Sequence, residues 1–342
     1  MKVFCAFDRK QLSELAEDNE TSLERKLDVA ASAFAHRDSW LKPYQRIEIL
    51  RKLSQLMEGK RDHFARQISS EGGKPLTDAI VETDRSIDGV RNAIEILGTS
   101  GGREIPMGIT PASDGRWAFT IREPIGVVAA VSAFNHPLNL IVHQVVPAIA
   151  VGCPVIVKPA APTPLSCIDL VTLVHEAGLP EEWCQTFLTE SNELAQKLVT
   201  DPRLAFFSFI GSSRVGWHLR SVLAPGTRCA LEHGGAAPAI IDKSADLDRV
   251  IEPLVKGGYY HAGQVCVSVQ RIYVHADIER TFLDRFAARV ATLKVGDPLL
   301  PETEVGPLIL PREADRVTAW IEEAAAGGAE IIGGGRLSET TL

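Results

Sequence analysis

The sequence predicts an α/β protein built around a parallel β-sheet. Short apolar runs recur from Gly126 onward, and helix-length stretches separate most of them. This alternation is typical of parallel strands that are buried on both faces and joined by helical crossovers. The predicted strands are Val127–Val131, Val155–Val157, Thr186–Leu188, Ala205–Phe209 and Ala239–Ile241. With 342 residues, 45% of them hydrophobic and 23% charged, the chain suits two folded domains or one large one, and a disordered chain is excluded.

Helices are expected before the first strand. The apolar residues Ile47, Leu50, Leu53 and Met57 recur at intervals of three and four, as on one face of an amphipathic helix. A second helical stretch covers Asp84–Leu97.

Residues 102–123 form an excursion between these helices and the sheet. Within it, Trp117–Arg122 alternates apolar and polar side chains. Such a stretch suits an exposed strand that pairs with another subunit, and a simple surface hairpin explains it equally well.

The segment after Val157 carries signals for both ends of a helix. Thr163 is placed to cap the first turn, Pro164 takes the first helical position, and Gly178 lies past the end.

The pattern restarts after Glu232, so we place a domain boundary near Leu231, with one domain over residues 1–231 and another over residues 232–342. The second domain is predicted to contain, in order, a helix over Asp246–Gly257, a strand over Arg271–Val274, a helix with Ile278, Phe282, Phe286 and Val290 on one face, a helix over Arg312–Ala325 and a strand at Ile331–Ile332.

Charge and cysteine patterns exclude several classes of partner. The chain has 36 basic and 44 acidic residues, a net charge of −8, without a basic run that could follow a nucleic acid backbone. Its six cysteines form no C-x-x-C pair, and no two histidines share a metal-binding spacing. We therefore expect no nucleic acid partner, no metal site and no disulfide framework.

The sequence also argues against export and membrane insertion. Residues 1–19 carry seven charged side chains where a signal peptide needs an apolar stretch, so we expect a cytoplasmic location. The uncharged segment Pro124–Val157 contains four prolines and several polar residues, which favours a strand, a turn and a core helix over a membrane helix.

Neither common nucleotide-binding motif is present, since G-x-G-x-x-G and the P-loop are both absent. Gly211 and Ser212 nevertheless follow a predicted strand and open a helix, where free N–H groups and a hydroxyl could face a phosphate. Plain helix capping explains this pair better when it is considered alone.

Three further residues have a chemical and a purely structural interpretation. Cys266 lies in a turn and is either a nucleophile or an inert core residue. Glu232 precedes two glycines and is either a general base or an ordinary carboxylate at a strand end. Asn135 follows the first strand and is either an amide donor or part of an Asx-turn. Together they supply the groups that acyl chemistry on a carbonyl requires.

The order and spacing of these motifs resemble the aldehyde dehydrogenase superfamily from about Arg46 to the last residue. The matching motifs are Arg122–Val127, Asn135, Lys158-Pro159, Gly211-Ser212, Glu232 with Gly234-Gly235, Gly263-Gln264-x-Cys266 and Gly296–Pro298. Phe134–Asn139 is most similar to the branch of lactaldehyde and glycolaldehyde dehydrogenases.

The resemblance implies an NAD(P)-dependent oxidation of a small, polar aldehyde to its acid. Cys266 would attack the aldehyde, the Asn135 amide and the Cys266 N–H would hold the oxyanion, and Glu232 would activate water against the thioester.

The resemblance also implies where the ligands bind and how the chain assembles. Lys158, Pro159, Gly211, Ser212 and Gly234 would contact the NAD or NADP cofactor in a Rossmann-like domain. His136 would contact the substrate, and the chain would form homodimers or homotetramers.

Three departures from the family pattern stand out. Ala161 occupies a position where many members carry a glutamate that repels the 2′-phosphate of NADP, so we expect NADP to be tolerated. His233 replaces the usual leucine beside Glu232, and a packed core residue is expected there. The sequence stops before the family's Glu-x-Phe-x-Pro segment, so we expect a C-terminally truncated chain with an incomplete catalytic domain.

Two rival functions remain open. One is a CoA-acylating aldehyde dehydrogenase, against which Glu232 speaks because its role is to activate water. The other is a catalytically inactive, truncated homologue that binds the cofactor or a full-length partner.

Overall fold

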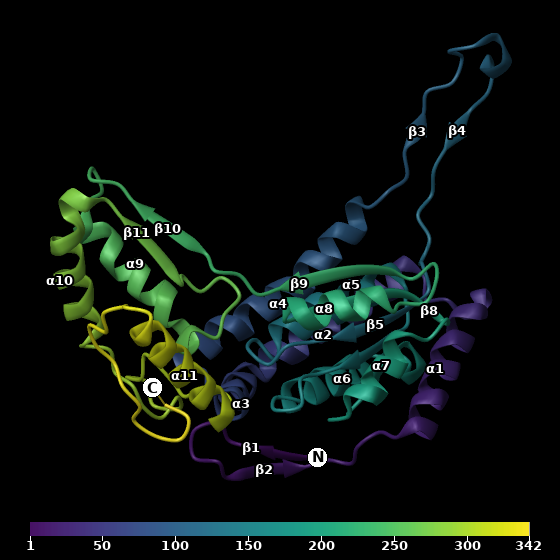
Figure 1. Ribbon diagram of the computed structural model, residues 1–342. Helices are drawn as coiled ribbons and strands as arrows, with labels where there is room; N and C mark the ends of the chain where they lie inside the picture. The colour runs from purple at the N-terminus through teal and green to yellow at the C-terminus, as the bar shows by residue number, and fades with distance from the viewer. Residues whose placement is uncertain (342) are drawn as a thin grey trace.

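The computed structural model describes residues 1–341 and has a five-stranded sheet at its centre (Figure 1). The strands lie in the order β7 (Cys184–Thr186), β6 (Val155–Lys158), β5 (Val127–Val131), β8 (Leu204–Gly211) and β9 (Arg228–His233). Each pairing between neighbours is parallel, which confirms the predicted fold class. The chain adds strands on one side of β5 first and then on the other, so the strand order reverses beside β5.

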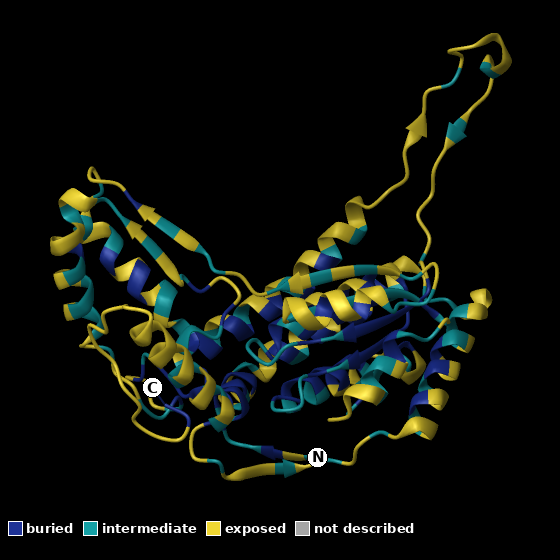
Figure 2. Cartoon of the chain, in the orientation of Figure 1, coloured by how far each residue is buried: buried dark blue, intermediate teal, exposed yellow. Residues whose placement is uncertain are grey.

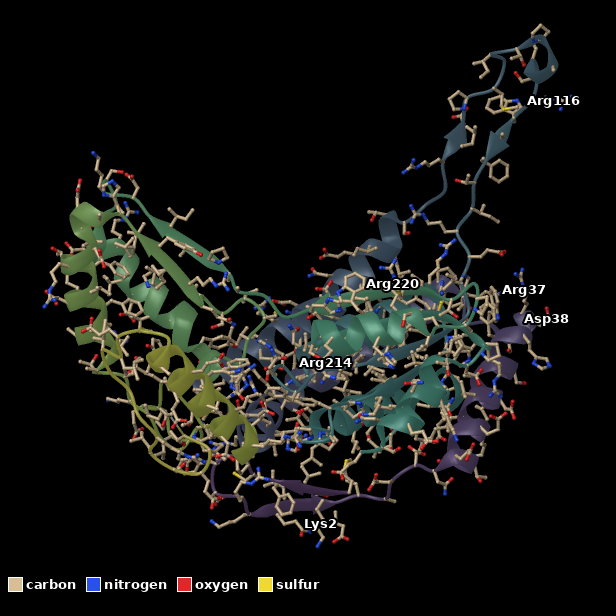
Figure 3. The ribbon with its side chains drawn as sticks, viewed as in Figure 1. Lys2, Arg37, Asp38, Arg116, Arg214 and Arg220 are labelled. Atoms are coloured by element: carbon tan, nitrogen blue, oxygen red, sulfur yellow. The ribbon has the colours of Figure 1, made fainter. Side chains whose placement is uncertain are left out.

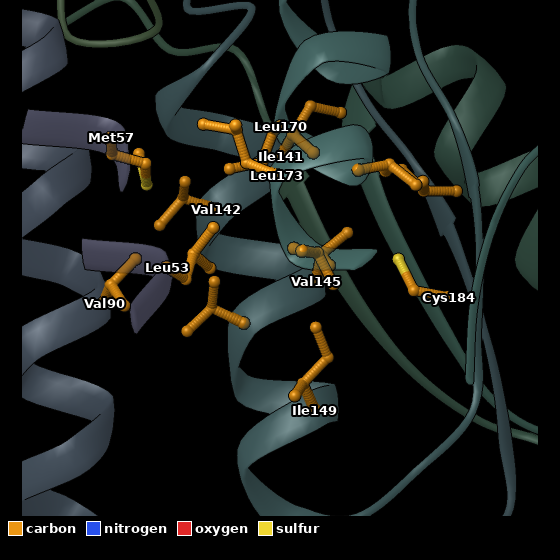
Figure 4. Close-up of a cluster of buried hydrophobic side chains, with 14 of the residues drawn as sticks. Leu53, Met57, Val90, Ile141, Val142, Val145, Ile149, Leu170, Leu173 and Cys184 are labelled. Carbon is orange, nitrogen blue, oxygen red and sulfur yellow. The ribbon is translucent and has the colours of Figure 1, made fainter. Parts of the chain in front are cut away.

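Helices cover both faces of this sheet, and β5 contributes side chains to both cores. Val127 and Ala129 pack in a core with the helices α1 (Glu20–Ala35), α7 (Asn192–Val199) and α8 (Ser213–Ser221). Val128 and Ala130 pack in the opposite core, part of which is drawn in Figure 4. The helices of that core are α2 (Pro43–Gly59), α3 (Arg61–Gly72), α4 (Leu76–Thr99), α5 (Asn139–Val151) and α6 (Leu165–Glu176).

The start of α6 differs from the prediction. Thr163 does not cap the helix, because its hydroxyl donates instead to the carbonyl of Phe134 at 3.5 Å. The N–H groups of Leu165 and Ser166 donate to the carboxylate of Glu71 on α3, at 2.8 and 3.0 Å. Glu71 therefore satisfies the open donors at the start of α6 from 94 positions away in the chain.

The strand predicted at Thr186–Leu188 begins and ends earlier, at Cys184–Thr186. Leu188 exchanges two hydrogen bonds with Asp18, donating to its carboxylate at 2.8 Å and accepting from its N–H at 2.7 Å. These contacts draw the chain out of the sheet after Thr186.

The strand predicted at Ile331–Ile332 is wrong. Both residues lie in irregular chain and are exposed. Three glycines follow directly, and glycine disfavours strands.

A second, smaller unit follows the five-stranded sheet (Figure 1). Its strands β10 (Pro238–Ile241) and β11 (Arg271–Val274) pair in parallel through the crossover helix α9 (Leu247–Tyr259). Together with α10 (Glu279–Val290), these elements enclose a core of their own, and α11 (Pro311–Ala326) follows. The main sheet ends at His233 and the second begins at Pro238, while the division into domains at residue 231 stays a prediction.

Two antiparallel hairpins extend the fold. The strands β1 (Lys2–Phe4) and β2 (Gln11–Glu14) form the N-terminal hairpin. The strands β3 (Glu104–Ile105) and β4 (Ala118–Phe119) form part of an arm that projects from the body and is exposed along its length (Figure 2). Trp117, Phe119 and Ile121 on this arm are 86%, 76% and 70% exposed. Pairing of the arm with another subunit stays a prediction.

The uncharged segment 124–157 forms β5, α5 and most of β6. Among the described residues, no helix combines the length and the apolar character that crossing a membrane requires.

Candidate active site

The carboxyl ends of the parallel strands bring Asn135, Lys158, Glu232 and the start of α8 to one edge of the main sheet. Lys158 on β6 is level with Val131 on β5, and Glu232 on β9 is level with Ile210 on β8. Asn135 follows β5 by four residues, and α8 begins directly after β8. Since parallel strands end at the same edge, these segments lie at the end of the sheet where open α/β sheets generally bind ligands.

Asn135 does not form an Asx-turn. Its Oδ1 atom is buried and has no hydrogen-bond partner among residues 1–341, whereas an Asx-turn would use this oxygen as an acceptor. The side chain is therefore not committed to the local turn, as a donor to a substrate oxygen requires.

Cys266 is exposed, so it is not an inert core residue. A Cβ atom added at Gly235 would lie 3.0 Å from the carbonyl oxygen of Cys266. The loop that carries Cys266 therefore rests against the glycine turn after β9. Glu232 is exposed near the end of β9, three residues before Gly235.

Gln264 ties the Cys266 loop to a distant segment. Its Oε1 accepts from the N–H of Ile309 at 2.9 Å, and its Nε2 donates to the carbonyls of Pro307 at 3.3 Å and His261 at 3.2 Å. In the sequence, Gln264 could be recognised only as part of the family motif. Its position two residues before Cys266 was the one signal that pointed to a role for it.

The turn η4 (Tyr260–Gly263) before this loop holds its backbone in the left-handed region. His261 and Ala262 have φ values of +48° and +54°, and Gly263 has +72°. Left-handed backbone costs a non-glycine residue about 1–2 kcal/mol, so this turn stores strain beside the nucleophile.

Replacing Ala262 with glycine is expected to raise the free energy of unfolding by up to about 1 kcal/mol. Relief of about 1–2 kcal/mol of strain outweighs the about 0.5–1 kcal/mol of chain entropy that glycine loses on folding. Urea unfolding would measure the change. Ala319→Gly, at an exposed position in the middle of α11, is the control and should lower stability by about 1 kcal/mol. If both variants have a lower free energy of unfolding than the wild type, the backbone at Ala262 is not strained.

The residues predicted to bind the cofactor lie at the ends of β6, β8 and β9. Ser212 is the N-cap residue of α8, yet its hydroxyl makes no capping hydrogen bond, contrary to the capping interpretation. A Cβ atom at Gly211 would lie 2.6 Å from the Phe209 ring, so a larger residue there would have to displace that ring. Figure 3 shows Arg214 and Arg220 on the same helix.

Lys158 is the last residue of β6, and Pro159 follows it. The Lys158 ammonium donates to the Pro159 carbonyl at 3.4 Å, and burial lowers the pKa of Lys158. At Gly234 an added Cβ would meet no atom within 4 Å, so surrounding atoms do not require glycine there.

His233 packs as the sequence predicted, with its ring against Phe209 and Trp217 at centroid distances of 6.2 and 5.3 Å.

His136 faces the interior beside the site. Its Nε2 lies 3.4 Å from the hydroxyl of Tyr260, and the two rings are 6.1 Å apart. Burial, and next the Lys74 ammonium, lower the pKa of His136 to about 4. His136 is therefore neutral at neutral pH, and its contact with the substrate stays a prediction.

This burial predicts an acid-sensitive fold. The folded chain keeps His136 neutral down to about pH 4, while an unfolded histidine takes up a proton near pH 6.5, so stability falls as the pH drops from 6.5 to 4. Between pH 7.5 and pH 5.0 the loss due to His136 should be about 2 kcal/mol. Urea unfolding of His136→Phe should show a loss smaller by this amount. An equal loss in the variant and the wild type would assign the acid sensitivity to other groups.

No group of three or more His, Cys, Asp or Glu residues within the described range 1–341 is arranged to hold a metal ion.

Known proteins with similar sequences are aldehyde dehydrogenases. The family model described as "Aldehyde dehydrogenase family" matches residues 1–341. The 3-sulfolactaldehyde dehydrogenase of Priestia aryabhattai is 36% identical over 320 residues, which cover 93% of this chain and 67% of that protein. The lactaldehyde dehydrogenase of Methanocaldococcus jannaschii is 34% identical over 296 residues, which cover 85% of this chain and 62% of that protein. This chain thus spans about two thirds of the length of these relatives.

The structural comparison agrees. The crystal structure of glyceraldehyde-3-phosphate dehydrogenase GapN from Methanocaldococcus jannaschii, complexed with NADP, superposes with a TM-score of 0.95 at 31% identity. The superposition covers all of this chain and 74% of that one. These matches confirm the resemblance predicted from the motifs: the chain belongs to the aldehyde dehydrogenase family.

Proposed function

We propose that this chain oxidises a small, polar aldehyde to its carboxylic acid with NAD(P)⁺, through covalent catalysis by Cys266. The observation that carries the proposal is the exposed thiol of Cys266 on a loop in contact with the Gly235 turn, three residues beyond Glu232. The names of the relatives, which act on sulfolactaldehyde and lactaldehyde, support a short aldehyde with polar substituents.

The residues at the sheet edge fit a dinucleotide. The first N–H groups of the nine-residue helix α8 and the uncommitted hydroxyl of Ser212 offer donors for a pyrophosphate. Gly211 adds no side chain of its own in front of that helix, and Lys158 at the end of β6, two strands from β8 in the sheet, can donate to a ribose hydroxyl. When bound, the cofactor supplies a hydride acceptor.

Groups of the chain itself carry out the remaining steps of the reaction. The Cys266 thiolate forms a bond to the aldehyde carbon, giving a thiohemiacetal. The Asn135 amide and the Cys266 N–H donate to the oxygen as it gains charge, and one such donor is worth about 3 kcal/mol of barrier in other enzymes. Loss of the hydride leaves an acyl thioester on Cys266. Glu232 then takes a proton from water, which attacks the thioester and releases the acid and the thiol.

Oxidation of a panel of aldehydes by the purified chain tests this function. Reduced cofactor should form fastest with short hydroxyaldehydes, including lactaldehyde, glycolaldehyde and sulfolactaldehyde, and acid should form in equal amount. Acyl-CoA in the presence of CoA would identify the acylating alternative. A folded chain that binds NAD(P)⁺ and oxidises none of the panel would support the non-catalytic alternative.

We further propose that NADP⁺ is accepted, because Ala161 places no carboxylate near the ribose site. The KM for NADP⁺ should lie within about tenfold of that for NAD⁺. Ala161→Glu should raise the KM for NADP⁺ at least tenfold, since like charges about 4 Å apart repel by several kcal/mol in partly shielded surroundings. Ala161→Gln has the same shape without the charge and should leave the preference unchanged. An equal effect of Glu and Gln would contradict the electrostatic explanation.

A further inference from the structure

The helix α4 carries a buried carboxylate that holds the segment after Asn135. Glu82 on α4 is 2% exposed, and its Oε1 accepts from the N–H groups of Leu138 and Asn139, both at 3.1 Å. These are open donors at the start of α5, which runs beside α4 (Figure 1). Pro137 has no N–H group, so these two are the first backbone donors after His136.

The other oxygen of Glu82 pairs with the ammonium of Lys74, and both side chains are fully buried. Lys74 lies in the short link between α3 and α4. A buried ion pair adds little net stability, because the cost of removing both charges from water offsets their attraction. The geometry that the pair imposes on its neighbours is therefore of more interest than its contribution to stability.

The same helix reaches the segment that leads to Cys266. Asp78, one turn before Glu82, accepts from the ammonium of Lys256 on α9 at 2.7 and 2.9 Å. The ammonium groups of Lys74 and Lys256 lie 5.7 and 5.1 Å from the ring centroid of Tyr260, within the range of cation–π contacts. Tyr260 opens the turn η4, six residues before Cys266.

The helix α4 and the link before it thus contact both segments that the reaction needs. Glu82 binds the start of α5 just after Asn135, and Asp78 and Lys74 reach α9 and Tyr260 on the path to Cys266. The hydroxyl of Tyr260 connects the two segments directly, because it lies 3.4 Å from Nε2 of His136.

We propose that Glu82 is a positioning residue: held by Lys74, it fixes the Asn135 turn relative to the Cys266 loop, so that the amide and the thiol meet the same carbonyl group. This inference rests on the proposed function, in which Asn135 and Cys266 act together. Glu82 touches neither substrate nor cofactor and acts through the two backbone N–H groups. A displacement of about 1 Å in such a turn costs about 10²-fold in rate.

Two double variants separate the effect of the acceptor oxygen of Glu82 from the effect of its charge. Lys74→Met/Glu82→Gln removes both charges and keeps a carbonyl oxygen for the N–H groups of Leu138 and Asn139. Lys74→Met/Glu82→Leu removes the same charges and the acceptor. Both are expected to fold, because the buried ion pair itself adds little net stability. The Leu variant should be the less stable one, because it leaves two backbone N–H groups without an acceptor. Hydrogen exchange within β5 and β6 is the folding control and should show both strands protected in the two variants.

The proposal predicts that the variants differ in rate and not in binding. The Leu variant should have a kcat about 10²-fold below that of the Gln variant, with similar KM for the aldehyde and similar Kd for NADP⁺. The Gln variant should stay within about fivefold of the wild type. Equal kcat values in the two variants would overturn the proposal, because a purely structural role for the ion pair affects both alike.

A second readout separates this proposal from the proposed function. Amide hydrogen exchange over residues 135–140 should be faster in the Leu variant than in the Gln variant, whether or not the chain oxidises any aldehyde. If the wild type shows no turnover, the proposed function fails while this comparison still decides the role of Glu82. Equal exchange over residues 135–140 in the two variants would overturn it.

Discussion

Replacing Cys266 with alanine is expected to abolish aldehyde-dependent reduction of NAD(P)⁺. The thiolate forms the bond that holds the substrate during hydride loss, and alanine offers no nucleophile in its place. Loss of a covalent nucleophile lowers kcat by about 10⁴-fold or more in other enzymes. The rate should be measured as formation of reduced cofactor with the best aldehyde of the panel.

The control for this variant is Cys5→Ala, which removes a half-buried cysteine from the N-terminal hairpin. It should keep the wild-type rate. The Kd for NADP⁺ should be unchanged in Cys266→Ala, because the residues proposed to bind the cofactor lie at the ends of β6, β8 and β9 and not on the Cys266 loop. A Cys266→Ala variant that retains more than a few per cent of the wild-type rate would exclude Cys266 as the nucleophile.

Replacing Glu232 with glutamine is expected to separate the two halves of the reaction. Without a base to activate water, the thioester on Cys266 should accumulate, so the first turnover should remain fast while steady-state turnover falls by about 10²–10⁴-fold. Rapid mixing should show a burst of reduced cofactor, close to one equivalent per active chain, followed by a slow phase.

The matched control is Glu182→Gln, an exposed glutamate that precedes the opposite, amino end of β7. It should show neither the burst nor the slow phase. Slow formation of reduced cofactor from the first turnover in Glu232→Gln would assign Glu232 to the first half of the reaction instead of to hydrolysis.

The central sheet could be predicted because its signal is local. The residues of β5 form an unbroken apolar run, since both faces of the strand are buried in separate cores. The strand at Arg271–Val274 was predicted with its bounds unchanged. The errors arose where distant residues decide the local structure. Glu71 caps α6, and Asp18 draws Leu188 away from the sheet, and neither partner can be identified from the neighbouring sequence.

The same distinction applies to the site. Asn135, Cys266 and Glu232 could be selected from motif order alone, and parallel strands explain why Asn135 and Glu232 lie at one edge. Whether each side chain is exposed or hydrogen-bonded could be determined only from the structure. The unpartnered oxygen of Asn135 and the exposure of Cys266 overturn the structural alternatives that the sequence had left open. The pairing of Lys74 with Glu82 depends on how α4 packs against α5, which no short motif records.

Peptide mass spectrometry of the acyl intermediate tests the central claim most directly. Glu232→Gln would be mixed with NADP⁺ and the best aldehyde, quenched in acid at the end of the burst and digested. The account predicts that the peptide containing Cys266 gains the mass of the acyl group, in an amount that matches the reduced cofactor, and that hydroxylamine removes it. Formation of reduced cofactor without acylation of this peptide would contradict covalent catalysis by Cys266.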